Sequence, residues 1–451
     1  MRFLPHTDQD VARMLEVIGA AGIDELFASI PAALRESAEL DLPAGLPEAE
    51  VLGRLRELQA RNSPAAGFQG AGCYRHYVPA IVAAVLGRGE FATAYTPYQP
   101  EVSQGTLQAC FEFQTYVSIL TGLEVANASM YDGASAFAEA VLMALRIGGN
   151  RERVLVSAAV HPEYRRVLGT YLDGYGRGRV SEIAIAADGR TDLEALEAEL
   201  GDDVAAVCIG YPNFFGVIDD LANASRLAKR VGALSISATT EALALGLLRE
   251  PGKAGADIAV AEGQSLGLPM SYGGPGVGLF ATRREFVRQM PGRLAGETID
   301  ERGRRGYVLT LATREQHIRR EKATSNICTN QGLAALAVTV FLSLAGRSGL
   351  RRLAELNATA AHSVCERLSR QPGVQKVYAG PFFNEFVVQV DDCSSWFEEC
   401  CGRGLIPGVP LSERLPSRED MADRILVTVT KTCSERDVDV LLRSLREREA
   451  A

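Results

Sequence analysis

Lysine is scarce in this sequence. Of its 451 residues, 47 are lysine or arginine, and the lysines are Lys229, Lys253, Lys322, Lys376 and Lys431. A reaction that runs through a Schiff base needs a primary amine, which a protein supplies from a lysine side chain. Any chemistry of that kind in this chain would have to use one of these five positions.

Several other features are missing as well. Nine cysteines are scattered without a CxxC pair or a His/Cys metal-ligand spacing, so we predict neither a metal centre nor a disulfide framework. The start, MRFLPHTDQD, has no apolar signal-peptide core, and we expect no apolar run long enough to span a bilayer. A net charge of -9 argues against nucleic acid as a partner. Together these absences predict a cytoplasmic protein without a membrane association.

What is present is the pattern of a large α/β protein. Hydrophobic residues make up 47% of the chain and charged residues 23%, as in ordinary globular proteins. Short β-rich runs alternate with amphipathic helical stretches, which implies parallel pairing and right-handed crossovers. A Gly-rich turn then precedes VGLFATR, which we expect to return into the same sheet as a hairpin. The predicted parallel strands lie at 153–157, 180–186, 204–210, 233–237 and 257–261.

Three parts can be distinguished along the chain. Residues 1–62 are expected to form an N-terminal helical arm, beginning with a capping box between Thr7 and Asp10. Residues 63–330 carry the alternating pattern of a large α/β domain. From 331 to 451, apolar helices and three short strands indicate a smaller C-terminal α+β domain.

One candidate anion site lies in the stretch NASMYDGASAFAEA, residues 127–140. Its small residues Gly133, Ala134 and Ser135 open a helix, so free N–H groups and the positive helix end could bind a phosphate. The alternative is a tight junction in which Ser135 only caps the helix. The residues alone do not decide between these interpretations.

A second stretch, GADIAVAEGQSLGLPMSYGGPGVGLF, combines a buried strand, a polar loop and a glycine-rich turn. In pyridoxal-phosphate enzymes of the aspartate-aminotransferase fold, this arrangement carries the lysine that binds the cofactor. Here the loop contains Gln264 and Ser265 but no lysine. Lys253 precedes the strand, which spans about 17 Å, and is therefore too far away to replace it.

A second requirement of such enzymes is also missing. They place an aspartate on an earlier strand, where it keeps the pyridine nitrogen of the cofactor protonated. Here the corresponding positions are Ser237, Ala238 and Thr239, and Glu241 is expected beyond the strand end. The scaffold therefore predicts a degenerate cofactor pocket, formed by Gly133, Ala134, Ser135, Gln264 and Ser265.

Long blocks of the sequence resemble one family. GAGCYRHYVPAIV, EFATAYTPYQPEVSQGTLQACFEFQT, LTGLEVANASMYDGASAFAEA and REKATSNICTNQ are similar to the P-protein (glycine decarboxylase) of the glycine cleavage system, specifically subunit 1 of its two-chain form. The resemblance implies a type I pyridoxal-phosphate transferase fold, with the cofactor on a lysine of subunit 2. It also implies decarboxylation of glycine and transfer of the aminomethyl group to the lipoyl arm of H-protein, within an α2β2 assembly.

The resemblance further implies that this chain, with no catalytic residue of its own, forms a wall of the partner's site. The segment 95–101 is one candidate for this wall, because two prolines stiffen it into an extended conformation. The alternative is a packed surface loop. The segment 321–326 could reach the partner's cofactor phosphate or could be a helix N-cap series. The candidate lining residues are Tyr95, Tyr98, Gln99, Tyr74 and His76, and the candidate phosphate residues are Lys322, Thr324, Ser325 and Asn326.

Two other functions stay open at this point. The chain could be a non-catalytic pseudoenzyme that regulates or scaffolds through its fold alone. It could also be a self-sufficient aminotransferase that uses an unconventional lysine such as Lys322. The second alternative predicts a yellow protein, since a lysine-bound cofactor absorbs visible light.

Overall fold

The structure, a computed structural model, describes residues 5–38, 40–62, 66–311, 320 and 323–449. The chain falls into two compact units, Met1–Ser63 and Pro64–Ala451. Lys322, one of the candidate phosphate residues, lies outside the described residues.

The first unit is a series of short helices. The predicted capping box between Thr7 and Asp10 is present at its start. None of the described residues in these helices is buried, so they form no hydrophobic core of their own. The helices are α1 (Asp8–Ile18), η1 (Ile23–Phe27), α2 (Ala32–Ser37) and α3 (Glu48–Ala60).

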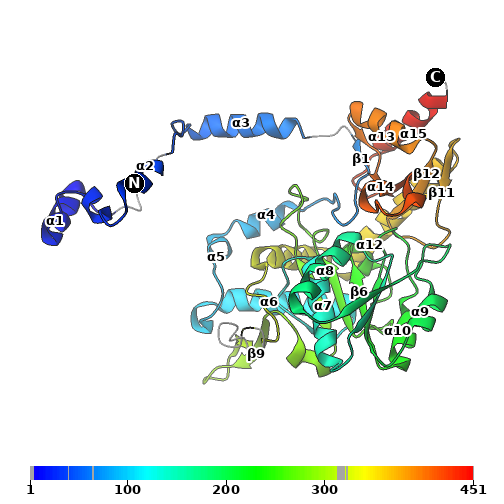
Figure 1. The fold of residues 1–451 in the computed structure, drawn as a ribbon, viewed down its shortest axis with the longest axis horizontal. Coiled ribbons are helices and arrows are strands. Elements are labelled where there is room, and N and C mark those ends of the chain that lie inside the picture. The colour runs from blue at the N-terminus through cyan, green and yellow to red at the C-terminus, as the bar shows by residue number, and fades with distance from the viewer. Residues whose placement is uncertain (1–4, 39, 63–65, 312–319, 321–322, 450–451) are drawn as a thin grey trace. The chain divides into compact units, whose positions relative to one another are not determined.

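A seven-stranded sheet forms the centre of the second unit (Figure 1), with strand order β2-β8-β7-β6-β5-β3-β4. Strands β3 to β7 run parallel to their neighbours, and β8 returns antiparallel beside β7, as the sequence predicts. The mostly parallel α/β fold is therefore confirmed. The strands are β2 (Val125–Ala126), β3 (Arg153–Ser157), β4 (Arg179–Ile183), β5 (Val204–Gly210), β6 (Leu234–Thr239), β7 (Ile258–Glu262) and β8 (Gly278–Thr282).

Helices cover both faces of this sheet because alternate strand residues point to opposite sides. Val154 and Val156 pack in the cluster formed with α7 (Gly133–Ile147) and α8 (Pro162–Tyr175). Leu155, between them, packs in the cluster that holds α9 (Leu193–Glu199) and α10 (Leu221–Arg230). The polar carboxyl ends of the parallel strands are thereby left to shape a site.

The longest helix, α12 (Gly332–Ser369), is broken at Gly346, where φ is 59° and glycine is favoured. This break divides α12 into two helices, in the region where the sequence predicts apolar helices. In the described part of the chain, α12 is also the one helix long and apolar enough to cross a membrane. The expectation that no apolar run has that length is therefore wrong. Half of the apolar window is buried, and the first half of α12 packs against α6 (Gln104–Thr121) in the core.

The C-terminal part adds a four-stranded antiparallel sheet with order β11-β12-β15-β14. The domain boundary expected near residue 330 stays a prediction, because the start of α12 shares a core with β7 and β8. The elements of this part are β11 (Val374–Lys376), β12 (Glu385–Val390), α13 (Cys393–Gly402), β13 (Leu405–Ile406), β14 (Val409–Pro410), α14 (Leu411–Arg414), η6 (Glu419–Met421), β15 (Arg424–Thr428) and α15 (Glu435–Glu449).

The remaining elements lie before and between these. Strand β1 pairs in parallel with β13, and β9 and β10 form an antiparallel hairpin. The remaining elements are β1 (Ala66–Gly67), α4 (Ala80–Leu86), α5 (Gly89–Ala92), η2 (Pro100–Val102), η3 (Ala242–Gly246), η4 (Arg284–Gln289), β9 (Leu294–Ile299) and β10 (Arg305–Thr310).

Candidate functional site

The N-terminus of α7 is capped from within the chain. Asp132 is the N-cap and accepts a hydrogen bond from the N–H of Ser135 at 2.7 Å. The Ser135 hydroxyl oxygen accepts one in return from the N–H of Asp132 at 3.2 Å. Ser135 is therefore the third helical residue of a capping box whose N-cap is Asp132. The N–H of Gly133, the first residue of α7, donates to the carboxylate of Glu262 at 2.9 Å and is therefore not available to an external anion.

Glu262, at the end of β7, occupies the position at this helix end where a bound anion would lie. Its carboxylate also accepts hydrogen bonds from the N–H groups of Gln264 and Val277, at 3.0 and 2.9 Å. Burial raises the pKa of the Glu262 carboxyl to about 7, although the three N–H donors oppose this rise. A Cβ atom at Gly133 would overlap the Tyr164 hydroxyl, so the space is filled. The residues present do not fit a phosphate here.

Gln264 lies in the loop that carries the cofactor-binding lysine in pyridoxal-phosphate enzymes, and its side chain is hydrogen-bonded within this chain. Its side-chain oxygen accepts the N–H of Tyr74 at 2.8 Å, and its side-chain nitrogen donates to the carbonyls of Tyr74 and Leu268, both at 2.9 Å. Lys253 lies before β7, is exposed, and pairs with Glu250 at 2.7 Å. Pyridoxal phosphate bound through a lysine therefore does not fit this loop.

Glu241 follows the end of β6, as expected, and it is buried. Its carboxylate is 2.9 Å from Nε2 of His76 and 3.3 Å from the amide nitrogen of Asn384. Burial alone would raise the pKa of Glu241, but the charge and hydrogen bond of His76 hold it below its usual value. Spacing in the sequence gave no signal of this pair, because 165 positions separate the two residues.

Tyr74 joins a second internal cluster, which links it to the C-terminal sheet. Its hydroxyl donates to Glu385 at 2.7 Å, and the carboxylate of Glu385 also accepts from Thr428 and from the N–H of Ala71, both at 2.8 Å. Burial raises the pKa of Glu385 to about 7, against the effect of these donors. Tyr74 and His76 thus already have partners inside the chain, which weighs against a place for either in a partner's site.

We expect Glu385 to make the free energy of unfolding depend on pH. Because folding raises its pKa, its contribution to stability is complete below an unfolded pKa near 4.5 and is lost as the pH rises through about 7. In Glu385→Gln, the amide oxygen can still accept from Ala71 and Thr428, and the amide nitrogen can donate to the Tyr74 oxygen. We expect this variant to be more stable than the parent at pH 8, by on the order of 1–3 kcal/mol, and no more stable at pH 5.

Denaturant unfolding at the two pH values measures this, and Glu262→Gln is the matched control. Every hydrogen-bond partner that the structure gives Glu262 is an N–H donor, so an amide nitrogen there would face a donor. That variant should lose stability at both pH values, and less at pH 8 than at pH 5, because burial raises the pKa of Glu262 to about 7 as well. Equal losses in the two variants at pH 8 would contradict the account of Glu385.

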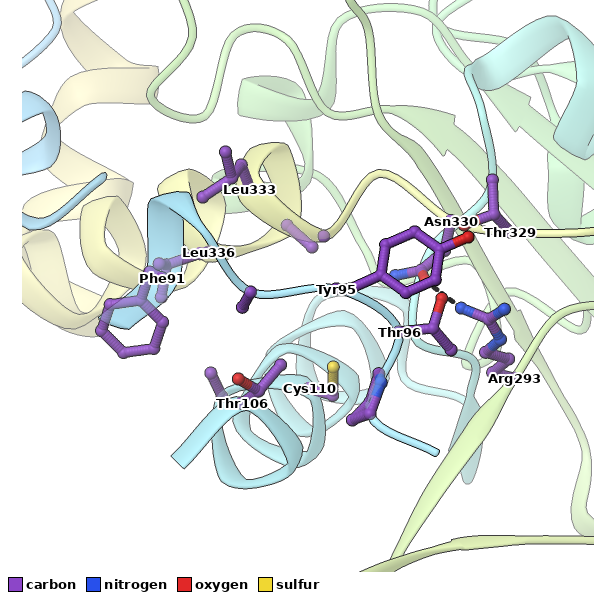
Figure 2. Close-up of a pocket in the computed structure, with 15 residues that line it drawn as sticks. Phe91, Tyr95, Thr96, Thr106, Cys110, Arg293, Thr329, Asn330, Leu333 and Leu336 are labelled. Carbon is purple, nitrogen blue, oxygen red and sulfur yellow. Dashed lines mark hydrogen bonds between the residues drawn. The ribbon is translucent and has the colours of Figure 1, made fainter. Parts of the chain in front are cut away.

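A cavity of about 190 Å³ lies at a different place, beside the segment 94–97 (Figure 2). It brings the segments 94–97 and 329–336 together, with Arg293 and α6 completing its lining. Pro97 is buried and anchors the first segment, while Tyr95 and Tyr98 are 86% and 68% exposed. Gln99 is exposed as well. These side chains are therefore free to contact a second chain.

The segment 323–326 lies elsewhere. Thr324 and Ser325 line a separate small cavity beside the end of β10, and Asn326 is exposed. They do not cap α12, whose N-cap is Gln331, so the interpretation of this segment as an N-cap series is wrong. Their place near a partner's phosphate stays a prediction.

Comparison with known proteins places these features in a family. The family model described as "Glycine cleavage system P-protein" matches residues 1–445. A protein from Anaeromyxobacter dehalogenans strain 2CP-C, named "Probable glycine dehydrogenase (decarboxylating) subunit 1", is 55% identical over 432 residues, 96% of each chain.

Solved structures agree with this. A crystal structure of glycine decarboxylase (P-protein) of the glycine cleavage system, in inhibitor-bound form, superposes with a TM-score of 0.90. It is 46% identical, over 99% of this chain and 100% of that one. A sphingosine-1-phosphate lyase from Burkholderia pseudomallei shares the fold alone, with a TM-score of 0.65 and 17% identity over 93% and 94% of the two chains. The chain therefore has the type I fold of pyridoxal-phosphate enzymes and belongs to the glycine cleavage system P-protein family.

Proposed function

We propose that this chain is the cofactor-free subunit of a two-chain glycine decarboxylase. Its relatives carry the name glycine dehydrogenase (decarboxylating) subunit 1, which implies a second subunit. In this proposal the partner, subunit 2, holds pyridoxal phosphate on its own lysine. The complex decarboxylates glycine and passes the aminomethyl group to the lipoyl arm of H-protein, and four chains assemble as α2β2.

The single observation that carries the proposal is the filled pocket at the end of β7. The carboxylate of Glu262 accepts a hydrogen bond from the N–H of Gly133, and the side chain of Gln264 bonds to the backbone N–H and carbonyl of Tyr74. These side chains occupy the space that a cofactor would need and use the hydrogen-bond donors that would bind it. The fold is kept while its cofactor site is closed. Such a chain contributes to the reaction through surfaces that it presents to another subunit.

Two surfaces support a role in assembly. The helices of the Met1–Ser63 unit expose large apolar side chains along their length, from Met14 to Leu58. In the other unit, Tyr95 and Tyr98 are exposed beside the cavity of Figure 2. We assign Tyr95, Tyr98 and Gln99 to the wall of the partner's site, where they would hold substrate in place and exclude water.

Two further points complete the proposal. The nine cysteines, all of them among the described residues, form no disulfide in the structure, which fits a reducing cytoplasm. No observation favours the pseudoenzyme alternative, since the relatives are named for a decarboxylating enzyme.

Reconstitution tests the function. Exchange of labelled CO2 into glycine, in the presence of H-protein, should be absent with this chain alone and should appear when subunit 2 is added. Light scattering of the mixture should give roughly four chains. Exchange by this chain alone, or undiminished exchange by subunit 2 alone, would overturn the proposal.

A further inference from the structure

Arg293 directly precedes β9 and lies at one end of the cavity in Figure 2. Its guanidinium donates to the side-chain oxygen of Asn330 at 3.2 Å and to the carbonyl of Cys328 at 3.1 Å. It also lies over the ring of Tyr98, 5.7 Å from the ring centre. Among the described residues, no carboxylate lies within ion-pair distance of it.

Partial burial of this charge makes the lack of a counter-ion informative. Arg293 is half-buried, and other half-buried arginines such as Arg153 and Arg283 have carboxylates at 2.7 Å. Among the described residues, Arg151 also bonds to carbonyl oxygens, of Val204 and Val231, but it does not line this cavity. A guanidinium has five N–H donors in a planar fork that matches a carboxylate or a phosphate. The acceptors that the described residues offer to Arg293 are neutral, so they do not compensate its charge.

The cavity has a polar and an apolar end. Figure 2 shows Thr96, Asn330 and the Arg293 guanidinium at one end, and Phe91, Leu333 and Leu336 toward the other. The first turn of α12 lines the same cavity and adds positive potential from its helix end. Among the lining residues that the structure describes, Arg293 thus carries the one formal charge, a cation.

Its size restricts the ligand. A volume of about 190 Å³ is below the roughly 300–1,000 Å³ of sites for drug-sized ligands. It has room for a small group such as an amino acid with its waters, at roughly 30 Å³ for each water. The exposed Tyr95 and Tyr98 leave the site open to a second chain.

We propose that Arg293 binds a small oxyanion presented at the partner's active site, either the carboxylate of glycine or the phosphate of the cofactor. This inference rests on the proposed function, because both anions would come from a site shared with subunit 2. Arg293 then neutralises the anion through its fork, while Asn330 and Cys328 fix the guanidinium plane and the ring of Tyr98 covers it.

The test is a binding titration of the assembled complex, followed by cofactor absorbance, with Arg293→Gln and Arg293→Lys. If the anion is the substrate carboxylate, the Kd of glycine rises about 10- to 100-fold in Arg293→Gln, whereas methylamine, which lacks the carboxylate, binds as before. If the anion is the phosphate, the Kd of pyridoxal phosphate rises instead and that of pyridoxal does not. Arg293→Lys keeps the positive charge but loses the planar fork of donors, so its Kd should lie between the values of the parent and of Arg293→Gln.

Arg151→Gln is the control, because Arg151 also donates to backbone carbonyls but does not line the cavity. It should leave both Kd values unchanged. Unchanged affinities for glycine and pyridoxal phosphate in Arg293→Gln, with an active parent complex, would overturn the inference. If Arg293→Gln fails to assemble with subunit 2, the same two Kd values are compared between Arg293→Lys and the parent. Failure of the proposed function looks different, because the parent complex itself would then show no exchange.

Discussion

A chain that begins at Pro64 is expected to keep its fold and to lose its partner. The described core begins at Ala66, so the second unit would lose no buried residue. The deleted unit exposes large apolar side chains such as Val17, at 84%, and Leu34, at 61%. Burying one such side chain fully is worth about 1.5–3 kcal/mol. We therefore expect affinity for subunit 2 to fall at least about 100-fold, or roughly 2.7 kcal/mol, as measured by sedimentation or a binding titration.

A matched pair of double variants on α3 checks that apolar contacts carry this effect. Leu55→Ser with Leu58→Ser should weaken assembly, whereas Arg54→Ser with Glu57→Ser on the same helix should change it little. All four side chains are exposed, so neither pair should alter the melting of the second unit. Wild-type affinity in the shortened chain would show that this unit has another role.

Tyr98→Phe should reduce glycine turnover without affecting folding. The side chain is 68% exposed, and its hydroxyl makes no hydrogen bond to any residue that the structure describes. The variant keeps the ring beneath Arg293 and removes one hydroxyl. Loss of a hydrogen bond that strengthens in the transition state costs about 1–3 kcal/mol, or about 5- to 150-fold in rate. Steady-state decarboxylation with saturating H-protein measures the change, beside a thermal melt of the complex.

Tyr175→Phe is the control for this experiment. Tyr175 ends α8 and is 38% exposed, so loss of its hydroxyl should have little effect. Tyr171 on the same helix is a less suitable control because it is half-buried against a hydrophobic cluster. Full turnover in both Tyr98→Phe and Tyr95→Phe would make the segment 95–99 structural. A parallel fall in turnover and melting temperature would indicate that the tyrosines pack an interface.

The strands of the central sheet were predictable because they are short apolar runs bounded by turns. β3 and β5 have the predicted bounds, 153–157 and 204–210. β4 ends earlier than expected, at Ile183, because Ile185 forms a separate bridge with Thr191 and the chain turns there. β1 and β2 have two residues each, too few to show a periodicity.

The absence of a lysine near Gln264 was visible in the sequence, but the way its pocket is filled was not. Tyr74 and Glu385 are 311 positions apart, and Gly133 and Glu262 are 129 apart. The first pair depends on how the segment 66–77 meets the C-terminal sheet, and the second on how the start of α7 meets the end of β7. Arg293 gave no signal for a similar reason: its significance lies in the cavity that it lines and in having no carboxylate partner among the described residues.

The location of the cofactor tests the central claim most directly. The reconstituted complex is treated with borohydride, which fixes pyridoxal phosphate to the lysine that holds it, and each chain is then digested and weighed by mass spectrometry. The account predicts the label on a lysine of subunit 2 and none on the five lysines of this chain. Stoichiometric label on any of these five, Lys322 included, would contradict it.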